Sequence, residues 1–143
     1  MDKYFEANGV LSLFCKNFME LKRGLPVRPS EMGVLNIIVG FPGPHTSVMI
    51  AERLGVSKPM ITAHLGSLAE KGYITKEQSK DDKRAFYVRP TEKAVALVES
   101  TKREMDSHLS RLVDAMGQED FERFVALSGR ANRILEAGRG EKK

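Results

Sequence analysis

Two groups of polar residues in the middle of the chain have types and spacings that suit nucleic-acid binding. Ser57, Lys58 and Thr62 supply hydroxyl and ammonium donors at the start of a helical pattern. Asp82 and Arg84 lie two positions apart in a charged segment between two apolar runs. An α-helix fits the major groove of DNA, and the N-terminal residues of such a helix reach the base edges. The N-terminus of the helix itself also attracts phosphate.

Residues for catalysis or metal binding form no comparable pattern. The chain has no phosphate-binding glycine loop, no Gly-x-Ser-x-Gly turn and no Cys-x-x-Cys or His-x-x-His spacing. Its three histidines, His45, His64 and His108, lie far apart along the sequence. We therefore expect no enzymatic activity, no catalytic residue, no metal site and no cofactor.

The first polar group falls in a predicted helix-turn-helix. A short helix is expected over residues 48–54, with Ser47 as its N-cap and Gly55 at its end. A second helix is expected over residues 58–71, and Ser57 can cap its first turn. Two short helices joined by a tight turn that contains glycine are typical of the helix-turn-helix motif.

The second helix of this motif has an apolar face and an opposite face that could touch a ligand. Ile61, Leu65 and Leu68 recur at helical spacing and are predicted to be buried. The opposite face presents small, polar and basic side chains, namely Lys58, Pro59, Thr62, Ala63 and Ser67.

The second polar group falls at the tip of a predicted β-hairpin. Residues 73–76 and 85–89 are rich in aromatic and β-branched types, which favour strands. The polar and charged residues 78–84 lie between them. Pro90 is expected to end the second strand, and Thr91 can cap the helix that follows. A hairpin in this place is the wing of a winged helix.

Apolar residues spaced three and four positions apart predict longer helices on both sides of this unit. The expected helices are residues 3–23, 29–40, 92–116 and 118–136. The predicted fold class is mainly α with a small β-wing, in one domain over residues 1–143. Within it, residues 29–91 form the winged helix-turn-helix lobe, and the flanking regions 1–28 and 92–137 pack on each other.

Charge and composition agree with this prediction. The 143-residue chain has a formal net charge of +4 and a sequence pI of about 9.3. Residues 45–90 carry 8 basic and 5 acidic side chains, whereas residues 91–143 carry 10 of each. The excess positive charge therefore falls where the two polar groups are. A start without a basic-then-apolar layout and the lack of a long apolar run predict a cytoplasmic protein without a membrane span.

Several runs in this segment resemble the MarR (multiple antibiotic resistance regulator) family of winged-helix transcriptional regulators. They are residues 49–57, residues 68–74 and the triplet Asp82-Lys83-Arg84, with Thr91 beyond it. The family carries an Asp-x-Arg motif in its wing, then a strand and a Leu-Thr pair, for which Pro90-Thr91 stands here. The resemblance implies that Arg84 enters the minor groove and that Asp82 holds its guanidinium.

The resemblance also implies a set of DNA-contacting residues on the second helix and the wing. They are Ser57, Lys58, Pro59, Thr62, Ala63, Ser67, Lys80, Asp82, Lys83 and Arg84. Ala63 and Ser67 stand where the family often has basic residues, His64 stands where an apolar residue is common, and Arg28 replaces the usual cap of the helix at 29–40. Phosphate contacts are therefore expected to depend more on the wing lysines.

The function implied is a sequence-specific transcriptional regulator. It would act as a homodimer through its flanking helices, bind a near-palindromic double-stranded operator, and be a repressor released by a small aromatic or phenolic effector. Two alternatives remain: a winged helix that binds proteins, and a thiol-based redox sensor that uses Cys15. Cys15 lies on the apolar face with Phe14 and Phe18, and Lys16 faces away from it, so a buried structural thiol is the favoured interpretation.

Overall fold

The structure is a computed structural model that describes residues 2–141, and the side chains of residues 2–139. The chain forms two compact units, Met1–Lys102 and Arg103–Lys143. Their boundary lies inside the long helix α5 (Glu92–Met116), which therefore contributes to both units. The expected division into a winged-helix lobe at residues 29–91 and flanking regions at 1–28 and 92–137 stays a prediction. It assigns functions to these segments, and the compactness of the two units does not test function.

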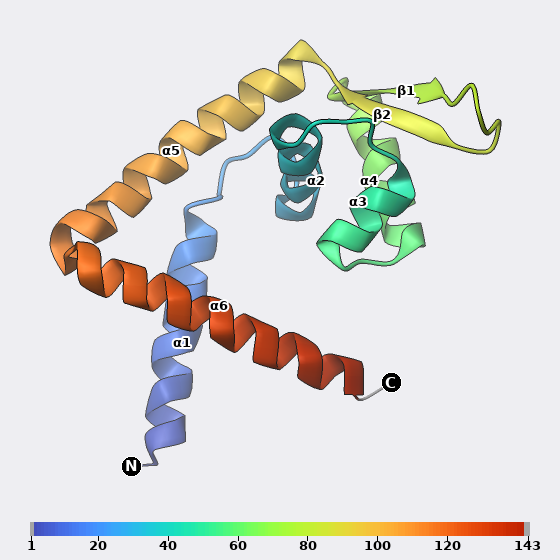
Figure 1. The fold of residues 1–143 in the computed structure, drawn as a ribbon. Helices are drawn as coiled ribbons and strands as arrows, with labels where there is room; N and C mark the ends of the chain where they lie inside the picture. The colour runs from blue at the N-terminus through green and yellow to red at the C-terminus, as the bar shows by residue number, and fades with distance from the viewer. Residues whose placement is uncertain (1, 142–143) are drawn as a thin grey trace. The chain divides into compact units, whose positions relative to one another are not determined.

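Four helices come first in the chain and agree with the predicted ones, with small shifts at their ends. They are α1 (Lys3–Glu20), α2 (Pro29–Gly40), α3 (Ser47–Leu54) and α4 (Lys58–Glu70) (Figure 1). Helix α1 ends three residues before the predicted residue 23, because a turn follows it and leads to Gly24. The N-cap of α3 is Thr46 and not Ser47: the Thr46 hydroxyl oxygen accepts from the Met49 N–H at 3.2 Å.

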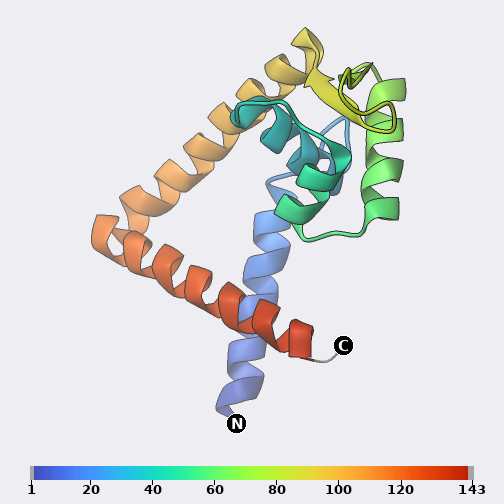
Figure 2. The same ribbon diagram turned by 45° about the vertical axis from the view of Figure 1, so that its right-hand side comes forward.

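The wing is a two-stranded antiparallel sheet. Strand β1 (Ile74–Gln78) pairs with β2 (Phe86–Pro90), so that Ile74 lies opposite Pro90. Both strands begin one residue later than predicted, and Pro90 is the last residue of β2 rather than its stop. The loop before α3 adds one more rung, because the Val88 N–H donates to the His45 carbonyl at 2.8 Å. The hairpin lies beside α4 in both views (Figures 1 and 2).

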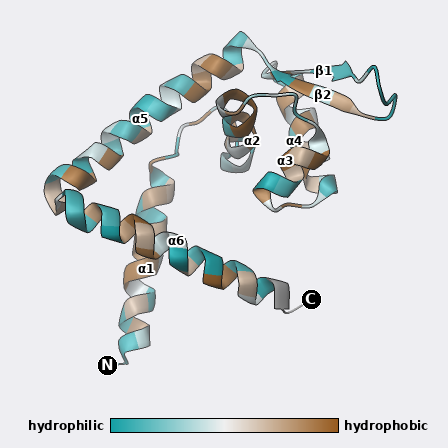
Figure 3. Cartoon of the chain, in the orientation of Figure 1, coloured by the Kyte–Doolittle hydropathy of each residue, from teal (hydrophilic) through white to brown (hydrophobic). Residues whose placement is uncertain are grey.

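The hydrophobic core lies among α2, α3, α4 and the hairpin. Helix α2 is the most apolar element of this unit (Figure 3). Leu35 of α2, Ile50 of α3 and Ile61 of α4 are fully buried, and Leu65 and Leu68 lie within the same cluster. The predicted apolar stripe of α4 is therefore confirmed. This packing fixes the inner face of α4 and leaves its opposite face exposed.

The second unit contains the end of α5 and helix α6 (Gln118–Glu141), which runs beyond the predicted residue 136. Large apolar side chains of α6 are exposed, among them Ile134 and Leu135. Among residues 2–141, no helix is both long and apolar enough to cross a membrane.

Helix α1 also has no buried residue. Cys15 is exposed, so its expected burial is wrong for the chain by itself. The spacing that places Cys15 on an apolar face is correct, but within the unit that contains α1 that face is not buried. Brown apolar positions are scattered along this helix in Figure 3.

Candidate nucleic-acid interface

Helix α4 presents the first group of predicted contact residues at its N-terminus. Gly55 has φ 66° and ψ 34°, in the left-handed region that favours glycine, so α3 can end sharply and α4 can begin three residues later. The Ser57 hydroxyl oxygen accepts from the Met60 N–H at 3.3 Å, which confirms the predicted cap. Ser57, Lys58 and Pro59 are all exposed. The first turn of α4 therefore offers a hydroxyl and an ammonium group to a ligand, whereas the Met60 N–H is used by the cap and Pro59 has no N–H.

The exposed face of α4 beyond this turn is poor in hydrogen-bond donors. Thr62 and Ala63 are exposed, on the side away from the buried Ile61. The Thr62 hydroxyl donates to the Lys58 carbonyl oxygen at 3.0 Å, so its hydrogen is used inside the helix. A Cβ added at Gly66 would meet open space. Contacts with bases along this part of α4 would therefore be mostly apolar.

The wing tip presents the second group. Lys80, Asp82, Lys83 and Arg84 are all exposed. Asp82 Oδ1 accepts from the backbone N–H of Arg84 at 2.9 Å. The expected pairing of Asp82 with the Arg84 guanidinium on DNA stays a prediction, and in this structure the carboxylate caps a tight turn by accepting from the backbone N–H. This contact orders the backbone of the tip, and the Arg84 side chain is exposed.

Further hydrogen bonds hold the turn of the wing. The buried Ser79 hydroxyl oxygen accepts from the N–H groups of Asp81 and Asp82, at 3.2 and 3.3 Å. The Gln78 side-chain amide donates to the Lys83 carbonyl at 2.8 Å. The basic side chains of the tip therefore project from an ordered turn.

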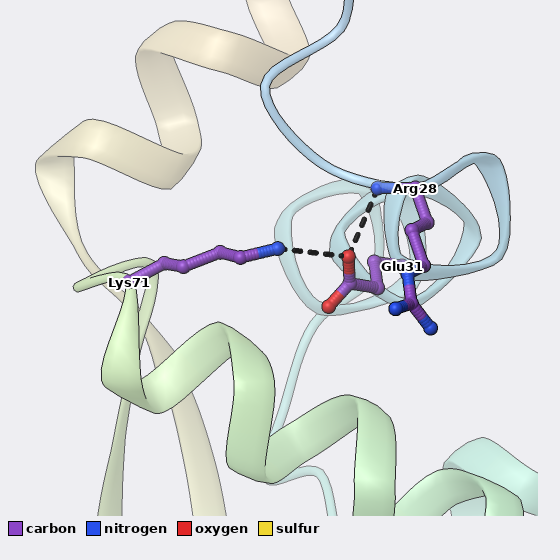
Figure 4. A network of polar contacts seen from close by, with 3 residues as sticks. All are labelled: Arg28, Glu31 and Lys71. Carbon is purple, nitrogen blue, oxygen red and sulfur yellow. Dashed lines mark hydrogen bonds and ion pairs between the residues drawn. The ribbon is translucent and has the colours of Figure 1, made fainter.

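Ser67 differs from the other predicted contact residues of α4, because it is half-buried and its hydroxyl lies near enough to the carboxylate of Glu31 to help lower the pKa of that group. Glu31 itself is 1% exposed. Its Oε1 accepts from the Arg28 N–H at 2.9 Å and from Lys71 Nζ at 3.2 Å (Figure 4). Burial raises the pKa of Glu31, but the hydrogen bonds from Ser67, Arg28 and Lys71 and the charge of Lys71 outweigh it and hold the pKa below its ordinary value.

This buried carboxylate was missed at the level of sequence. A glutamate three residues after a helix cap is half of a capping box, but the cap residue here is Arg28 instead of serine or threonine. Its other partner, Lys71, is 40 residues away in the chain. The only local signal was therefore the position of Glu31 in the first turn of α2.

Comparisons with known proteins agree on this architecture. A model of the MarR family matches residues 24–85, which span α2 to the wing tip. The segment from α2 to the wing tip is therefore similar to the MarR family. Streptococcus pneumoniae FabT, solved in complex with DNA, is 22% identical, covers 99% of this chain and 100% of its own, and has a TM-score of 0.77.

Two further solved structures share the fold. The transcriptional repressor CouR, bound to a 23-mer DNA duplex, is 22% identical over 92% of each chain, with a TM-score of 0.74. PcaV from Streptomyces coelicolor, solved with its natural ligand, is 16% identical and covers 93% of this chain and 96% of its own, with a TM-score of 0.76. These likenesses confirm the predicted MarR-like winged helix with flanking helices.

The MarR-like surface formed by α4 and the wing carries several cations without an ion-pair partner among the described residues. Arg89 is neutralised by Glu77, at 2.6 Å, and Lys71 by Glu31. The remaining basic side chains of this surface have no such partner, namely Lys58, Lys76, Lys80, Lys83 and Arg84. Unpaired cations on one surface raise the local positive potential, which favours a polyanion.

The three histidines lie on different segments of the chain. His45 is buried, and its Nε2 lies 3.0 Å from the Phe41 carbonyl oxygen, so its role is to hold the loop between α2 and α3. His64 lies on α4 and His108 on α5. Within residues 2–141, no three His, Cys, Asp or Glu side chains lie together as metal ligands would.

Proposed function

We propose that this protein is a sequence-specific DNA-binding transcriptional regulator. The observation that carries the proposal is the pairing of two exposed elements in one MarR-like lobe: the capped N-terminus of α4, and an ordered wing tip with three cations. Helix α4 has the size and the exposed donors to enter a major groove. FabT and CouR, which share the fold, were both solved with DNA, and CouR is a repressor.

The two elements have different tasks in this proposal. Ser57, Lys58 and Thr62 approach base edges and phosphates in the major groove, with Pro59 and Ala63 in apolar contact. Arg84 enters the adjacent minor groove, where narrow A·T segments carry enhanced negative potential. Lys80 and Lys83 contact phosphates, and Asp82 fixes the turn that presents them. Ser67 stays in the predicted contact set, although its hydroxyl also faces Glu31.

The regulator acts as a homodimer in this proposal. Exposed apolar side chains support it, since they occur on both flanking regions: Tyr4, Phe5, Leu11 and Leu13 on α1, and Val125, Leu127, Ile134 and Leu135 on α6. Large exposed apolar surfaces mark sites of association. A two-fold dimer places two copies of α4 about one helical turn of DNA apart, so the operator is near-palindromic.

A small aromatic or phenolic effector belongs to the proposal as the signal that releases DNA. PcaV was solved with a natural ligand. In the present chain, a cavity of about 390 Å³ beside α3 is lined in part by Phe41, His45 and Arg53. A ring there would meet Phe41, whose face the Arg53 guanidinium already covers at 3.9 Å. Repression is the expected sense of regulation.

The remaining predictions concern the location of the protein, enzymatic activity and the two alternative functions. A protein that reads DNA must share a compartment with it, in keeping with the predicted cytoplasmic location. No enzymatic activity is proposed, because the exposed groups suit binding. The protein-interaction alternative requires that no DNA sequence be preferred, and the thiol-sensing alternative at Cys15 requires that oxidation change DNA affinity.

Selection of binding sites from random duplex DNA by the purified protein tests the proposal. The expected result is an enriched near-palindrome with half-sites about one helical turn apart, bound with an affinity that falls steeply with salt. An unenriched pool with weak binding only would overturn the regulator proposal and favour the protein-interaction alternative.

A further inference from the structure

The contact between Glu31 and helix α4 links two helices at a place outside the exposed interface. The carboxylate lies in the first turn of α2, and its ion-pair partner Lys71 is the C-cap of α4, with Ser67 one turn before it. Figure 4 shows the Lys71 side chain extending from the end of α4 toward this carboxylate. Because Glu31 is 1% exposed and Lys71 is 40% exposed, the pair has its anion inside and its cation at the surface.

The geometry of the two partners restrains how α4 can turn about its axis. Ser67 and Lys71 are four residues apart, so they share one side of the helix. The Lys71–Glu31 ion pair at 3.2 Å, with the half-buried Ser67 on the same side of the helix, opposes rotation of the helix as well as its separation from α2. A rotation of about 20° would move a side-chain tip, about 5–6 Å from the helix axis, by about 2 Å. That displacement exceeds the tolerance of a hydrogen bond to a base, whose length varies by only about 0.5 Å.

The end of α4 is held from a second direction as well. The Lys71 carbonyl accepts from Lys93 Nζ at 2.7 Å, and the Gly72 carbonyl accepts from the Thr91 hydroxyl at 2.8 Å. Lys93 and Thr91 lie at the start of α5. The last turn of α4 is therefore fixed between α2 and the beginning of α5, and Glu31 is the one buried charge in this junction.

We propose that Glu31 is a positioning residue for DNA recognition, which acts through Lys71 and Ser67 to set the orientation of α4 in the major groove. This inference rests on the proposed function and assigns a determinant of specificity to a side chain that cannot touch DNA. A purely structural role would change the stability of the lobe and leave its preference among DNA sequences unaltered.

The test compares wild type with Glu31→Gln, which keeps the size of the side chain and removes its charge. Each protein is titrated with the selected site and with a scrambled duplex of equal length, at a temperature where circular dichroism shows both proteins fully folded. Removal of a negative charge should leave non-specific binding unchanged or tighter. The ratio of specific to non-specific affinity should fall by about tenfold, the effect of one mismatched base pair.

Glu99→Gln is the matched control, since Glu99 is exposed on α5 and undergoes the same change of charge. It should leave the ratio within twofold of wild type. An unchanged ratio for Glu31→Gln would overturn the positioning role while the proposed function stands. A wild type that enriches no site would instead overturn the proposed function.

Two further variants keep the proposal testable if Glu31→Gln does not fold. Lys71→Gln changes a half-exposed side chain and should lower the ratio, whereas Lys71→Arg keeps the ion pair and should restore it. Equal ratios for Lys71→Gln and Lys71→Arg would overturn the proposal.

A double-mutant comparison separates positioning from direct contact at Ser67. If Ser67 acts with Glu31, Ser67→Ala should lower specific affinity in wild type and have little further effect in Glu31→Gln. Equal effects in both backgrounds would show that Ser67 acts without Glu31, which contradicts the proposal.

Discussion

Replacing Asp82 by alanine should weaken specific DNA binding, although it removes a negative charge from the surface proposed to contact DNA. Asp82 Oδ1 accepts from the Arg84 N–H at 2.9 Å and so holds the turn that presents Arg84. Simple electrostatics predicts the opposite sign, because the net charge of the wing tip becomes more positive. The sign of the change therefore distinguishes an ordered tip from a merely cationic one.

The magnitude follows from the single contact that is lost. A typical hydrogen bond contributes about 0.5–1.5 kcal/mol net. If the tip must be ordered in order to bind DNA, loss of the Asp82 contact weakens the free energy of binding by that amount. That range corresponds to a loss of about 2- to 12-fold in affinity at 25 °C. Asp82→Asn is the matched variant, because its side-chain oxygen can still accept from the Arg84 N–H while the charge is gone. Its affinity should equal or exceed that of wild type.

Fluorescence anisotropy with the selected operator measures both variants at two salt concentrations. Arg84→Ala in the same series should weaken binding by about 1–3 kcal/mol, as expected for an arginine that reads DNA. If Asp82→Ala tightens binding as much as Asp82→Asn does, the turn has no role in recognition. The orientation of Arg84 by the Asp82 contact would then be refuted.

Three further predictions concern the core, the bases and the pH dependence of stability. Ile61→Ala should lower the free energy of unfolding by about 2–5 kcal/mol in a urea titration, because Ile61 is 0% exposed, whereas Lys58→Ala should change it by less than about 0.5 kcal/mol. Replacing thymine by deoxyuridine opposite Thr62 and Ala63 should weaken binding about fourfold per methyl group, as measured by anisotropy, since that part of α4 offers mainly apolar contact. Because the pKa of Glu31 is lowered in the folded state, its stabilisation is complete above the ordinary value of 4.5 and is lost as the pH falls below it. In urea titrations that run from neutral pH to below 4.5, Glu31→Gln should reduce the acid dependence of stability, and an unreduced dependence would assign it to other carboxylates.

Helix ends marked by local signals could be predicted from the sequence. Pro29 and Thr91 lie at the predicted starts of α2 and α5, and both helices begin where expected. Thr91 caps α5, since its hydroxyl oxygen accepts from the Ala94 N–H at 3.4 Å. Gly55 and Ser57 likewise define the turn between α3 and α4. In each case the capping or turn residue lies within four residues of the helix end that it determines. A short stretch of sequence is therefore enough to predict that helix end.

Contacts between distant residues could not be predicted in this way. The Val88–His45 rung and the Lys71–Glu31 pair join segments about 40 residues apart. The Asp82-x-Arg84 pattern was local, but it suits two hydrogen bonds equally well, one to the guanidinium and one to the backbone N–H. A pattern of residue types does not tell which nitrogen donates.

The surface of α1 shows another limit of sequence reasoning. Helical spacing placed Cys15 on an apolar face with Phe14 and Phe18, whose rings stack at 5.7 Å between centroids. Spacing identifies which residues share a face, but it does not identify the surface that covers the face. Within the chain, Cys15 stays exposed.

The most direct test of the central claim replaces single A·T pairs of the selected operator by inosine·cytosine or by guanine·cytosine. An inosine·cytosine pair matches A·T in the minor groove, because inosine lacks the 2-amino group of guanine. In the major groove the same pair presents the edge of G·C and so differs from A·T. If α4 reads the major groove and Arg84 the minor groove, positions facing α4 should not tolerate inosine·cytosine. Positions facing the wing should tolerate inosine·cytosine and reject guanine·cytosine, and Arg84→Ala should abolish that rejection. Equal sensitivity of both sets of positions to inosine·cytosine, unchanged in Arg84→Ala, would contradict the two-groove account.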